Sequence, residues 1–143
     1  MITELRLERE FNVTPKRLFD AISKQSELLQ WWGPESMFVS DHKLDFSRMG
    51  PWFSTLENPQ GQQYKVSGQV THVDPITSVG FTWGWHGDND QRGAESHVTL
   101  TVTETASGAR LIIDHRALSD SDQGASHEAG WTSSLRKLAS LLA

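Results

Sequence analysis

Residues 121–142 read SDQGASHEAGWTSSLRKLASLL, and this stretch decides the fold of the chain. Apolar residues recur in it at intervals of four, three and four positions: Trp131, Leu135, Leu138 and Leu142. His127 lies one turn earlier on the same stripe, and this spacing is typical of an amphipathic helix that packs on another layer. We therefore predict a helix over residues 121–142, with His127 and Trp131 facing a sheet.

The strands that could form this sheet lie directly upstream. The strongest signal is the strict alternation of large residues with Gly80, Thr82 and Gly84, which places the large ones on one face: Val79, Phe81, Trp83 and Trp85. Similar alternation between turn residues predicts further strands over residues 38–41 with 43–46, 52–57, 64–73, 97–103 and 109–117. Gly68 falls inside one of them, where a strand often bends or another group approaches closely.

The N-terminal part predicts one more strand and two short helices. Charged and apolar residues alternate through about Val13, which indicates a half-exposed strand. Thr14 and Pro15 then form a typical helix start, and a second helix covers residues 26–31 before a turn at residues 32–34. A sheet built from successive hairpins with its helices segregated belongs to the α+β class. We expect residues 1–143 to form a single domain.

Composition excludes several classes of function. Lys and Arg number 13 against 18 Asp and Glu, a net charge of −5, which argues against binding to nucleic acid through phosphate contacts. The chain has no Cys, so it offers neither disulfides nor a thiolate metal site. We recognise no signal peptide and no apolar run of the ~20 residues that a membrane span requires. A cytoplasmic location is expected, as a monomer or a homodimer.

Motif searches give no cofactor or metal. The six histidines include no pair spaced by four residues, and the run from Asp88 to Asp90 departs from a calcium loop because Arg92 and Thr99 occupy ligand positions. No glycine-rich nucleotide loop and no serine-hydrolase elbow occurs. We therefore expect no metal and no cofactor.

A set of residues distributed over the whole chain resembles a known family. They are Arg9 and Phe11, Pro15 with Leu18 and Phe19, Trp31-Trp32-Gly33-Pro34, Asp45 ahead of Met49-Gly50 and Trp52, Gly68 and Val70 ahead of Asp74-Pro75, Phe81-Thr82-Trp83, Gly108, His115, and His127 with Gly130-Trp131 and Leu135. In order and spacing they resemble the activator-of-Hsp90-ATPase-like (AHSA1) branch of the SRPBCC superfamily, also called Bet v 1/START-like. Two departures are Met49 in place of a usual glycine, and Ala109-Arg110 in place of a usual Gly-Thr.

The resemblance implies a helix-grip fold, in which a curved seven-stranded antiparallel sheet wraps around the long C-terminal helix. Between sheet and helix it implies an apolar cavity. Members of the superfamily mostly bind hydrophobic or aromatic small molecules, and some are cyclases, dehydratases or hydrolases. The eukaryotic protein that gives the branch its name is a co-chaperone.

The candidate ligand-binding residues are those expected to face this cavity: Trp31, Trp52, Phe81, Trp83, Trp85, Ile113, His115, His127, Trp131 and Leu135. Tryptophan side chains there could form an aromatic wall for a flat ligand or simply pack the core. His115 and His127 could bind a ligand oxygen or transfer a proton, or they could be core histidines bonded to the backbone. Of Trp31 and Trp32, one is expected at the cavity entrance. Gly130 indicates either a close approach or simple tolerance of glycine.

Three functions follow, in order of preference. The first is binding of a small hydrophobic or aromatic molecule between the C-terminal helix and the sheet. The second is an enzyme of the cyclase, dehydratase or hydrolase type, with His115 or His127 as general acid or base. The third is a protein-interaction module like the co-chaperone, with Hsp90 as the partner.

Overall fold

The computed structural model describes residues 4–116 and 124–143, except for the side chains of residues 88 and 124–128. The elements follow one another as β1 (Leu5–Phe11), α1 (Pro15–Ser23), α2 (Gln25–Trp31), β2 (Phe38–Lys43), β3 (Gly50–Glu57), β4 (Gln63–Asp74), β5 (Ser78–Trp85), a short 3₁₀ turn (Asp88–Asp90), β6 (Ser96–Thr105), β7 (Gly108–Arg116) and α3 (Gly124–Leu142). Of the helix predicted over residues 121–142, the part from Gly124 onward is confirmed, and residues 121–123 lie outside the described residues.

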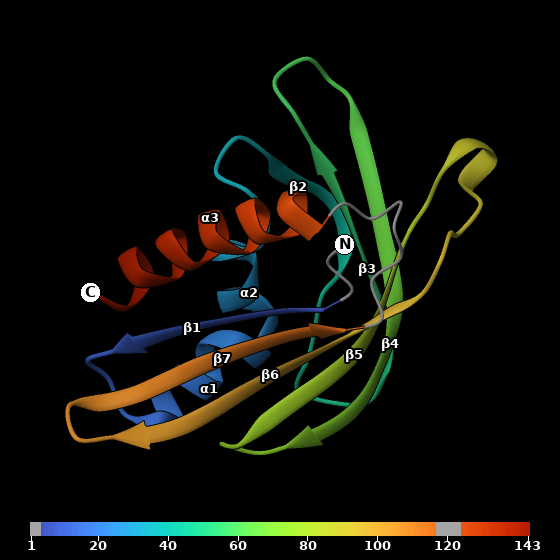
Figure 1. The fold of residues 1–143 in the computed structure, drawn as a ribbon. Coiled ribbons are helices and arrows are strands. Elements are labelled where there is room, and N and C mark those ends of the chain that lie inside the picture. Colours follow the sequence, from blue (N-terminus) through green and yellow to red (C-terminus); the bar gives the residue numbers. More distant parts are fainter. Residues whose placement is uncertain (1–3, 117–123) are drawn as a thin grey trace.

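The strands form one antiparallel sheet in the order β1-β7-β6-β5-β4-β3-β2. From β2 to β7 each strand pairs with the next one along the chain, and β1 adds to the far edge beside β7. Figure 1 shows that the sheet curves around α3, with α1 and α2 on the same side of the sheet as α3. The predicted arrangement of seven strands around one long helix is confirmed.

The two short helices begin and end as their residues predict. The Thr14 side chain accepts a hydrogen bond from the Arg17 backbone N–H, and Pro15 occupies the first helical position. After α2 the chain turns at Gly33, whose φ is +83°. This backbone angle favours glycine, and a Cβ atom here would also lie 2.8 Å from Leu56 Cδ2, so the Leu56 side chain would have to shift. This turn carries the chain from α2 to β2.

One predicted strand is wrong in its second half. Leu44 and Phe46 are fully buried with Asp45 between them, so the alternation was interpreted correctly. However, β2 ends at Lys43, and the Phe46 backbone N–H donates to the Ser23 carbonyl at the end of α1 (2.9 Å) rather than to a neighbouring strand. The segment therefore ties α1 to the core while having the side-chain pattern of a strand.

Gly68 lets an aromatic side chain cross β4. Trp52 on β3 is the cross-strand partner of Gly68, and its indole N–H donates to the Thr82 carbonyl on β5 at 3.0 Å. A Cβ atom at Gly68 would lie 2.0 Å from the Thr82 carbonyl oxygen. The close approach predicted for Gly68 is thus confirmed, and the group that approaches is the backbone of β5.

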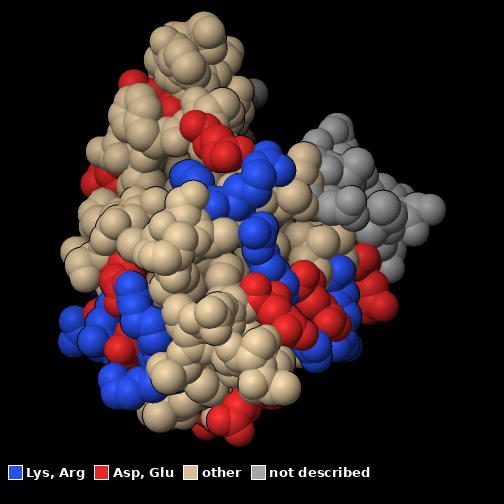
Figure 2. Space-filling view, turned by 90° about the vertical axis from the view of Figure 1, so that its left-hand side faces the viewer, with Lys and Arg blue, Asp and Glu red and all other residues tan. Residues whose placement is uncertain are grey.

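The surface carries charges of both signs. Figure 2 shows Lys and Arg side chains interspersed with Asp and Glu over the face that it views. Among the helices of the described residues, none is long and apolar enough to cross a membrane.

Candidate functional site

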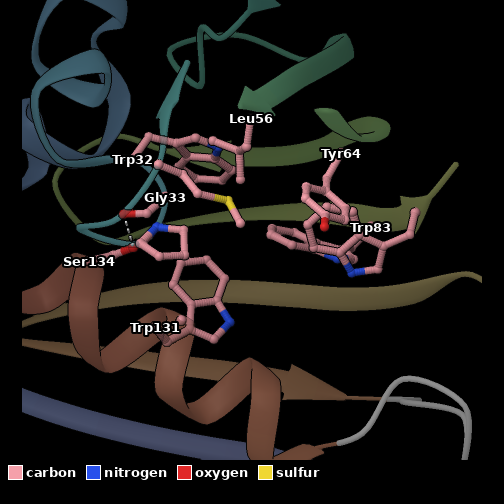
Figure 3. Close-up of a pocket in the computed structure, with 11 residues that line it drawn as sticks. Trp32, Gly33, Leu56, Tyr64, Trp83, Trp131 and Ser134 are labelled. Carbon is pink, nitrogen blue, oxygen red and sulfur yellow. Dashed lines mark hydrogen bonds between the residues drawn. The ribbon is translucent and has the colours of Figure 1, made fainter. Parts of the chain in front are cut away.

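A pocket of about 270 Å³ opens between α3, the segment after α2, and strands β3 to β5. It is lined by Trp32, Gly33, Pro34, Met37, Leu56, Tyr64, Trp83, Trp85, Gly130, Trp131 and Ser134. Figure 3 shows Trp131 rising from α3 into the pocket, with Trp32 opposite it and Tyr64 pointing in from the sheet. Helix, turn and sheet each contribute one wall, so the pocket exists only when all three segments are in place.

The lining is almost entirely apolar. Four of its residues are tryptophans, and among the lining residues that the structure describes none is acidic, basic or a histidine. The Ser134 hydroxyl donates to the Gly33 carbonyl at 3.0 Å, and the Trp32 indole N–H donates to the Ser54 hydroxyl at 2.9 Å. Tyr64 is 42% exposed, which places its phenol at the rim. Such a lining favours a neutral ligand with a large apolar surface.

A ring cluster under the pocket holds Trp32 in place. Its ring contacts six other aromatic rings, at centroid distances from 5.6 to 6.4 Å: Phe46, Trp52, Trp83, Trp131, Trp31 and Phe81. Most of these pairs are edge-to-face or tilted, which is the favourable geometry for aromatic rings. Trp32 therefore connects the floor of the pocket to α3.

Hydrogen bonds attach the turn after α2 to α3. The Lys137 ammonium donates to the Trp32 carbonyl at 3.1 Å, and Ser134 donates to the next carbonyl, that of Gly33. Burial lowers the pKa of Lys137, because the charged form loses part of its hydration there. These bonds satisfy two backbone carbonyls in the turn that follows α2. They also fix the wall of the pocket that faces α3.

Glu35 forms the outer part of the same attachment. Its backbone N–H donates to the Ser133 hydroxyl at 2.7 Å, and its carboxylate accepts from Arg136 at 2.8 and 3.1 Å and from Ser133 at 3.1 Å. The hydrogen bonds from Arg136 and then Ser133 lower the pKa of Glu35, and Glu35 in turn raises the pKa of Arg136. An ion pair this exposed contributes little to stability by itself. Its role here is to hold the segment after α2 against α3.

This pair predicts an acid-dependent loss of stability. The pKa of Glu35 is lowered in the folded protein from its ordinary value of 4.5, so its contribution is complete above that pH and is lost as the pH falls through the lowered value. We expect the melting temperature to fall less steeply below pH 4.5 in Glu35→Gln than in the wild type. A Glu104→Gln variant, changed at an exposed position on β6, should keep the wild-type slope. If the melting temperatures of Glu35→Gln and the wild type fall equally steeply below pH 4.5, this prediction is wrong.

His115 is buried behind the pocket rather than in its lining. Its Nδ1 accepts a hydrogen bond from the Trp131 indole N–H at 3.2 Å, and its Nε2 lies 2.7 Å from the Ser96 hydroxyl. Because an indole N–H only donates, Nδ1 carries no proton, and the proton of the neutral ring resides on Nε2. Ser96 in turn donates to the Trp83 carbonyl at 3.4 Å. His115 thereby fixes the orientation of a pocket tryptophan.

The structure distributes the ten residues proposed from the sequence between two layers. Trp83, Trp85 and Trp131 line the pocket. Six others are buried in the core outside the lining: Trp31, Trp52, Phe81, Ile113, His115 and Leu135. The side chain of His127 lies outside the described residues. The neighbouring residues Trp31 and Trp32 are both buried, but only Trp32 lines the pocket. The Trp31 indole N–H instead donates to the Ala21 carbonyl within the helical layer.

Sequence reasoning missed part of the lining. Leu56 and Tyr64 lie on the same face of their strands as the inward residues, at spacings of two, so the period of two could have identified them. Gly130 also lines the pocket, and the nearest atom to a Cβ placed there would be Pro34 Cγ at 4.0 Å. The neighbouring residues therefore leave room for a Cβ atom at Gly130, and the glycine leaves space in the pocket.

Comparisons with known proteins agree with this architecture. A family model described as "Activator of Hsp90 ATPase homolog 1-like protein" matches residues 12–143. A solved structure of an AHSA1 protein from Silicibacter pomeroyi shares 62% sequence identity, with a TM-score of 0.93 over 97% of this chain and 96% of that chain. None of the curated proteins compared with the sequence matches it.

Two more distant structures share the fold. A protein from Chromobacterium violaceum is 22% identical, with a TM-score of 0.86 over 99% of this chain and 98% of that chain. A protein from Mycobacterium smegmatis is 21% identical, with a TM-score of 0.81 over 99% and 91%. Together these likenesses confirm the helix-grip fold expected from the sequence.

Proposed function

The chain belongs to the family of activator of Hsp90 ATPase homolog 1-like proteins, and we propose that it binds a small, neutral, largely apolar or aromatic molecule in the pocket between α3 and the sheet. The observation that carries the proposal is the lining itself, where four tryptophans surround the space and no described lining residue is charged. Its volume of about 270 Å³ lies just below the ~300–1,000 Å³ of pockets for drug-sized ligands. The ligand is therefore small.

The walls favour a flat ligand. The rings of Trp83 and Trp131 are 5.6 Å apart at a tilt of 48°, and Trp85 lies edge-on to Trp83 at 5.5 Å. Aromatic faces and edges of this kind attract another aromatic ring in offset or edge-on contact. At the rim, the Tyr64 hydroxyl supplies a polar group within reach of solvent. A ring system with one polar substituent directed at the rim satisfies both features.

Thermal-shift screening of a library of small aromatic molecules tests the proposal. A ligand present at 100 times its dissociation constant stabilises the folded state by about 2.7 kcal/mol. We expect that stabilisation to disappear in Trp131→Ala, which removes one wall, and in Gly130→Leu, which fills the space from α3. Phe38→Ala, at a side chain that is 55% exposed on β2, should retain it.

The two pocket variants exclude a trivial explanation. Trp131→Ala removes a buried ring and also lowers the stability of the ligand-free protein, whereas Gly130→Leu removes the space and leaves the buried rings present. Loss of ligand response in both variants therefore points to the pocket. A ligand whose stabilisation survives in Gly130→Leu binds elsewhere, and that result would refute the proposal.

The name of the family contains Hsp90, and binding to Hsp90 is our third interpretation for this chain. Retention of the protein on immobilised Hsp90, unaffected by Gly130→Leu, would favour a protein-interaction role over the pocket. The enzymatic interpretation through His115 requires a substrate at a ring that lies outside the pocket lining and whose nitrogens contact Trp131 and Ser96. The pocket is therefore the better supported candidate.

A further inference from the structure

A serine, a histidine and an aspartate lie in line on the outer face of the sheet, the face turned away from α3. Ser67 on β4 has its hydroxyl 2.7 Å from Nε2 of His86, the residue that follows β5. Nδ1 of His86 lies 2.7 Å from the carboxylate of Asp90. Ser67 alternates with the buried Val66, so this row is separated from the pocket by the sheet.

The hydrogen bonds define which nitrogen of His86 carries the proton. Nδ1 faces two acceptors of Asp90, its carboxylate at 2.7 Å and its backbone carbonyl at 3.2 Å. Two acceptors at one nitrogen require a proton on that nitrogen. Nε2 of the neutral ring is then an acceptor, and it receives the hydrogen bond of the Ser67 hydroxyl. This is the arrangement in which a histidine serves as general base for a serine.

The loop that carries Asp90 is held in an unusual conformation. Asn89 and Asp90 both have φ of 59°, in the left-handed region that non-glycine residues seldom adopt. Backbone hydrogen bonds close the loop at its base, from Gly87 N–H to the Gln91 carbonyl and from Gly93 N–H to the Trp85 carbonyl, each 2.7 Å. Figure 1 shows this loop after β5 projecting away from the sheet on the side opposite α3. With Asn89 and Asp90 in this left-handed conformation, the carboxylate and the backbone carbonyl of Asp90 both face Nδ1 of His86.

A cation lies beside the serine. The Arg92 guanidinium donates to the Ser67 carbonyl from Nη2 at 2.9 Å and from Nε at 3.3 Å, and its Nη1 donates to Glu95 at 3.0 Å. It lies across Gly84, the cross-strand partner of Ser67, where a Cβ atom would come within 2.6 Å of the guanidinium carbon. Glycine at this position therefore makes room for a positive charge next to Ser67. Lys65 adds a second cation, 3.7 Å from Asp90.

From this geometry we propose that Ser67 is a nucleophile for acyl transfer from small carboxylic esters, with His86 as its general base and Asp90 as a positioning residue. The site is independent of the pocket function, because it uses the opposite face of the sheet. Arg92 is placed to stabilise negative charge that develops on the carbonyl oxygen of the ester. Overall, ester and water give a carboxylic acid and an alcohol.

The reaction proceeds in two balanced steps. The Ser67 oxygen attacks the carbonyl carbon, its proton passes to Nε2 of His86, and the bond from carbon to the leaving oxygen breaks as that oxygen takes the proton. Water then attacks the acyl-serine, gives its proton to Nε2, and the proton returns to Ser67 as the acid leaves. Every step uses groups in the structure plus substrate and water.

A second serine–histidine pair on the same sheet provides a matched control. The Ser78 hydroxyl lies 3.1 Å from Nε2 of His72, and among the described residues no carboxylate lies within ion-pair distance of His72. Ser78→Ala thus removes a serine hydroxyl from a pair without the third member. Its activity should equal that of the wild type.

The decisive test is a fluorophosphonate probe, followed by peptide mass mapping, together with hydrolysis of 4-nitrophenyl acetate. We expect the adduct on Ser67 of the wild-type protein. General base catalysis is worth ~10²–10⁴ in rate, so Ser67→Ala and His86→Gln should lower the hydrolysis rate by about 100-fold. An adduct on any other residue, or wild-type hydrolysis by Ser67→Ala, would overturn the proposal.

The role of Asp90 has its own readout. Nitrogen-15 NMR of the histidine rings reports which nitrogen of His86 is protonated. We expect the Nδ1–H form in the wild type and a larger share of the Nε2–H form in Asp90→Asn, whose amide can donate to Nδ1 in competition with the backbone carbonyl acceptor. Hydrolysis by Asp90→Asn should fall at least tenfold while its melting temperature stays close to that of the wild type. A wild-type ring protonated on Nε2 would contradict the assignment of His86 as general base.

Discussion

Replacing Trp32 by alanine is expected to lower the free energy of unfolding by about 3–5 kcal/mol, the cost of truncating a buried tryptophan. Trp32 is 3% exposed, and its ring meets six other aromatic rings. The change opens a cavity at the centre of this cluster and leaves the Ser54 hydroxyl without its indole donor. Since small domains are stable by ~5–15 kcal/mol in total, the loss is a large share.

Urea denaturation followed by tryptophan fluorescence and by circular dichroism measures this effect. Trp32→Phe keeps an aromatic ring and should be destabilised less than Trp32→Ala. Phe38→Ala removes a ring of comparable chemistry from a side chain that is 55% exposed, and should change stability by at most about 0.5 kcal/mol. Equal stability of Trp32→Ala and Phe38→Ala would show that the ring cluster does not hold the fold together.

Adding a single methyl group at Gly68 is expected to destabilise the protein by about 3 kcal/mol, at the upper end of the usual cost of overpacking. The new Cβ would lie 2.0 Å from the Thr82 carbonyl oxygen and 2.6 Å from its carbon. Both are backbone atoms of β5, so relief requires the two strands to separate. The hydrogen bond from the Trp52 indole to the same carbonyl would be lost with that movement.

The same substitution at Gly130 is the matched control. Gly130 lies inside α3, and a Cβ atom there would have Pro34 Cγ at 4.0 Å as its nearest neighbour. Alanine is favoured over glycine in a helix by about 1 kcal/mol, so Gly130→Ala should stabilise the protein. Thermal unfolding of the two variants should therefore give shifts of opposite sign. A neutral Gly68→Ala variant would mean that β4 and β5 can separate at no cost.

Local patterns in the sequence were sufficient for the architecture. The alternation of large residues such as Phe81 and Trp83 with small ones such as Gly84 predicted β5 and its inner face. Thr14 and Pro15 predicted the start of α1. Each of these signals is complete within a few residues. The strand expected over residues 43–46 does not continue beyond Lys43, because the Phe46 N–H donates to the Ser23 carbonyl at the end of α1. Alternation alone does not reveal such a distant partner.

The pocket could be predicted only in part. Its walls come from α3, the turn after α2 and the sheet, and only the tertiary structure decides which of two adjacent tryptophans turns inward. Trp32 does so because the Trp31 indole bonds to the Ala21 carbonyl. The site of Ser67, His86 and Asp90 was equally hidden, because Ser67 lies on β4, His86 follows β5, and Asp90 faces His86 through its left-handed backbone.

The place of β1 in the sheet has a consequence for the order in which the protein folds. Strands β2 to β7 pair with their neighbours along the chain, so their contacts close short loops. β1, however, pairs with β7, joining Phe11 to Ala109 and Leu5 to His115. During synthesis β1 leaves the ribosome first but has no partner until the last strand follows. Completion of the sheet therefore waits for nearly the whole chain, and non-local pairing of this kind slows folding.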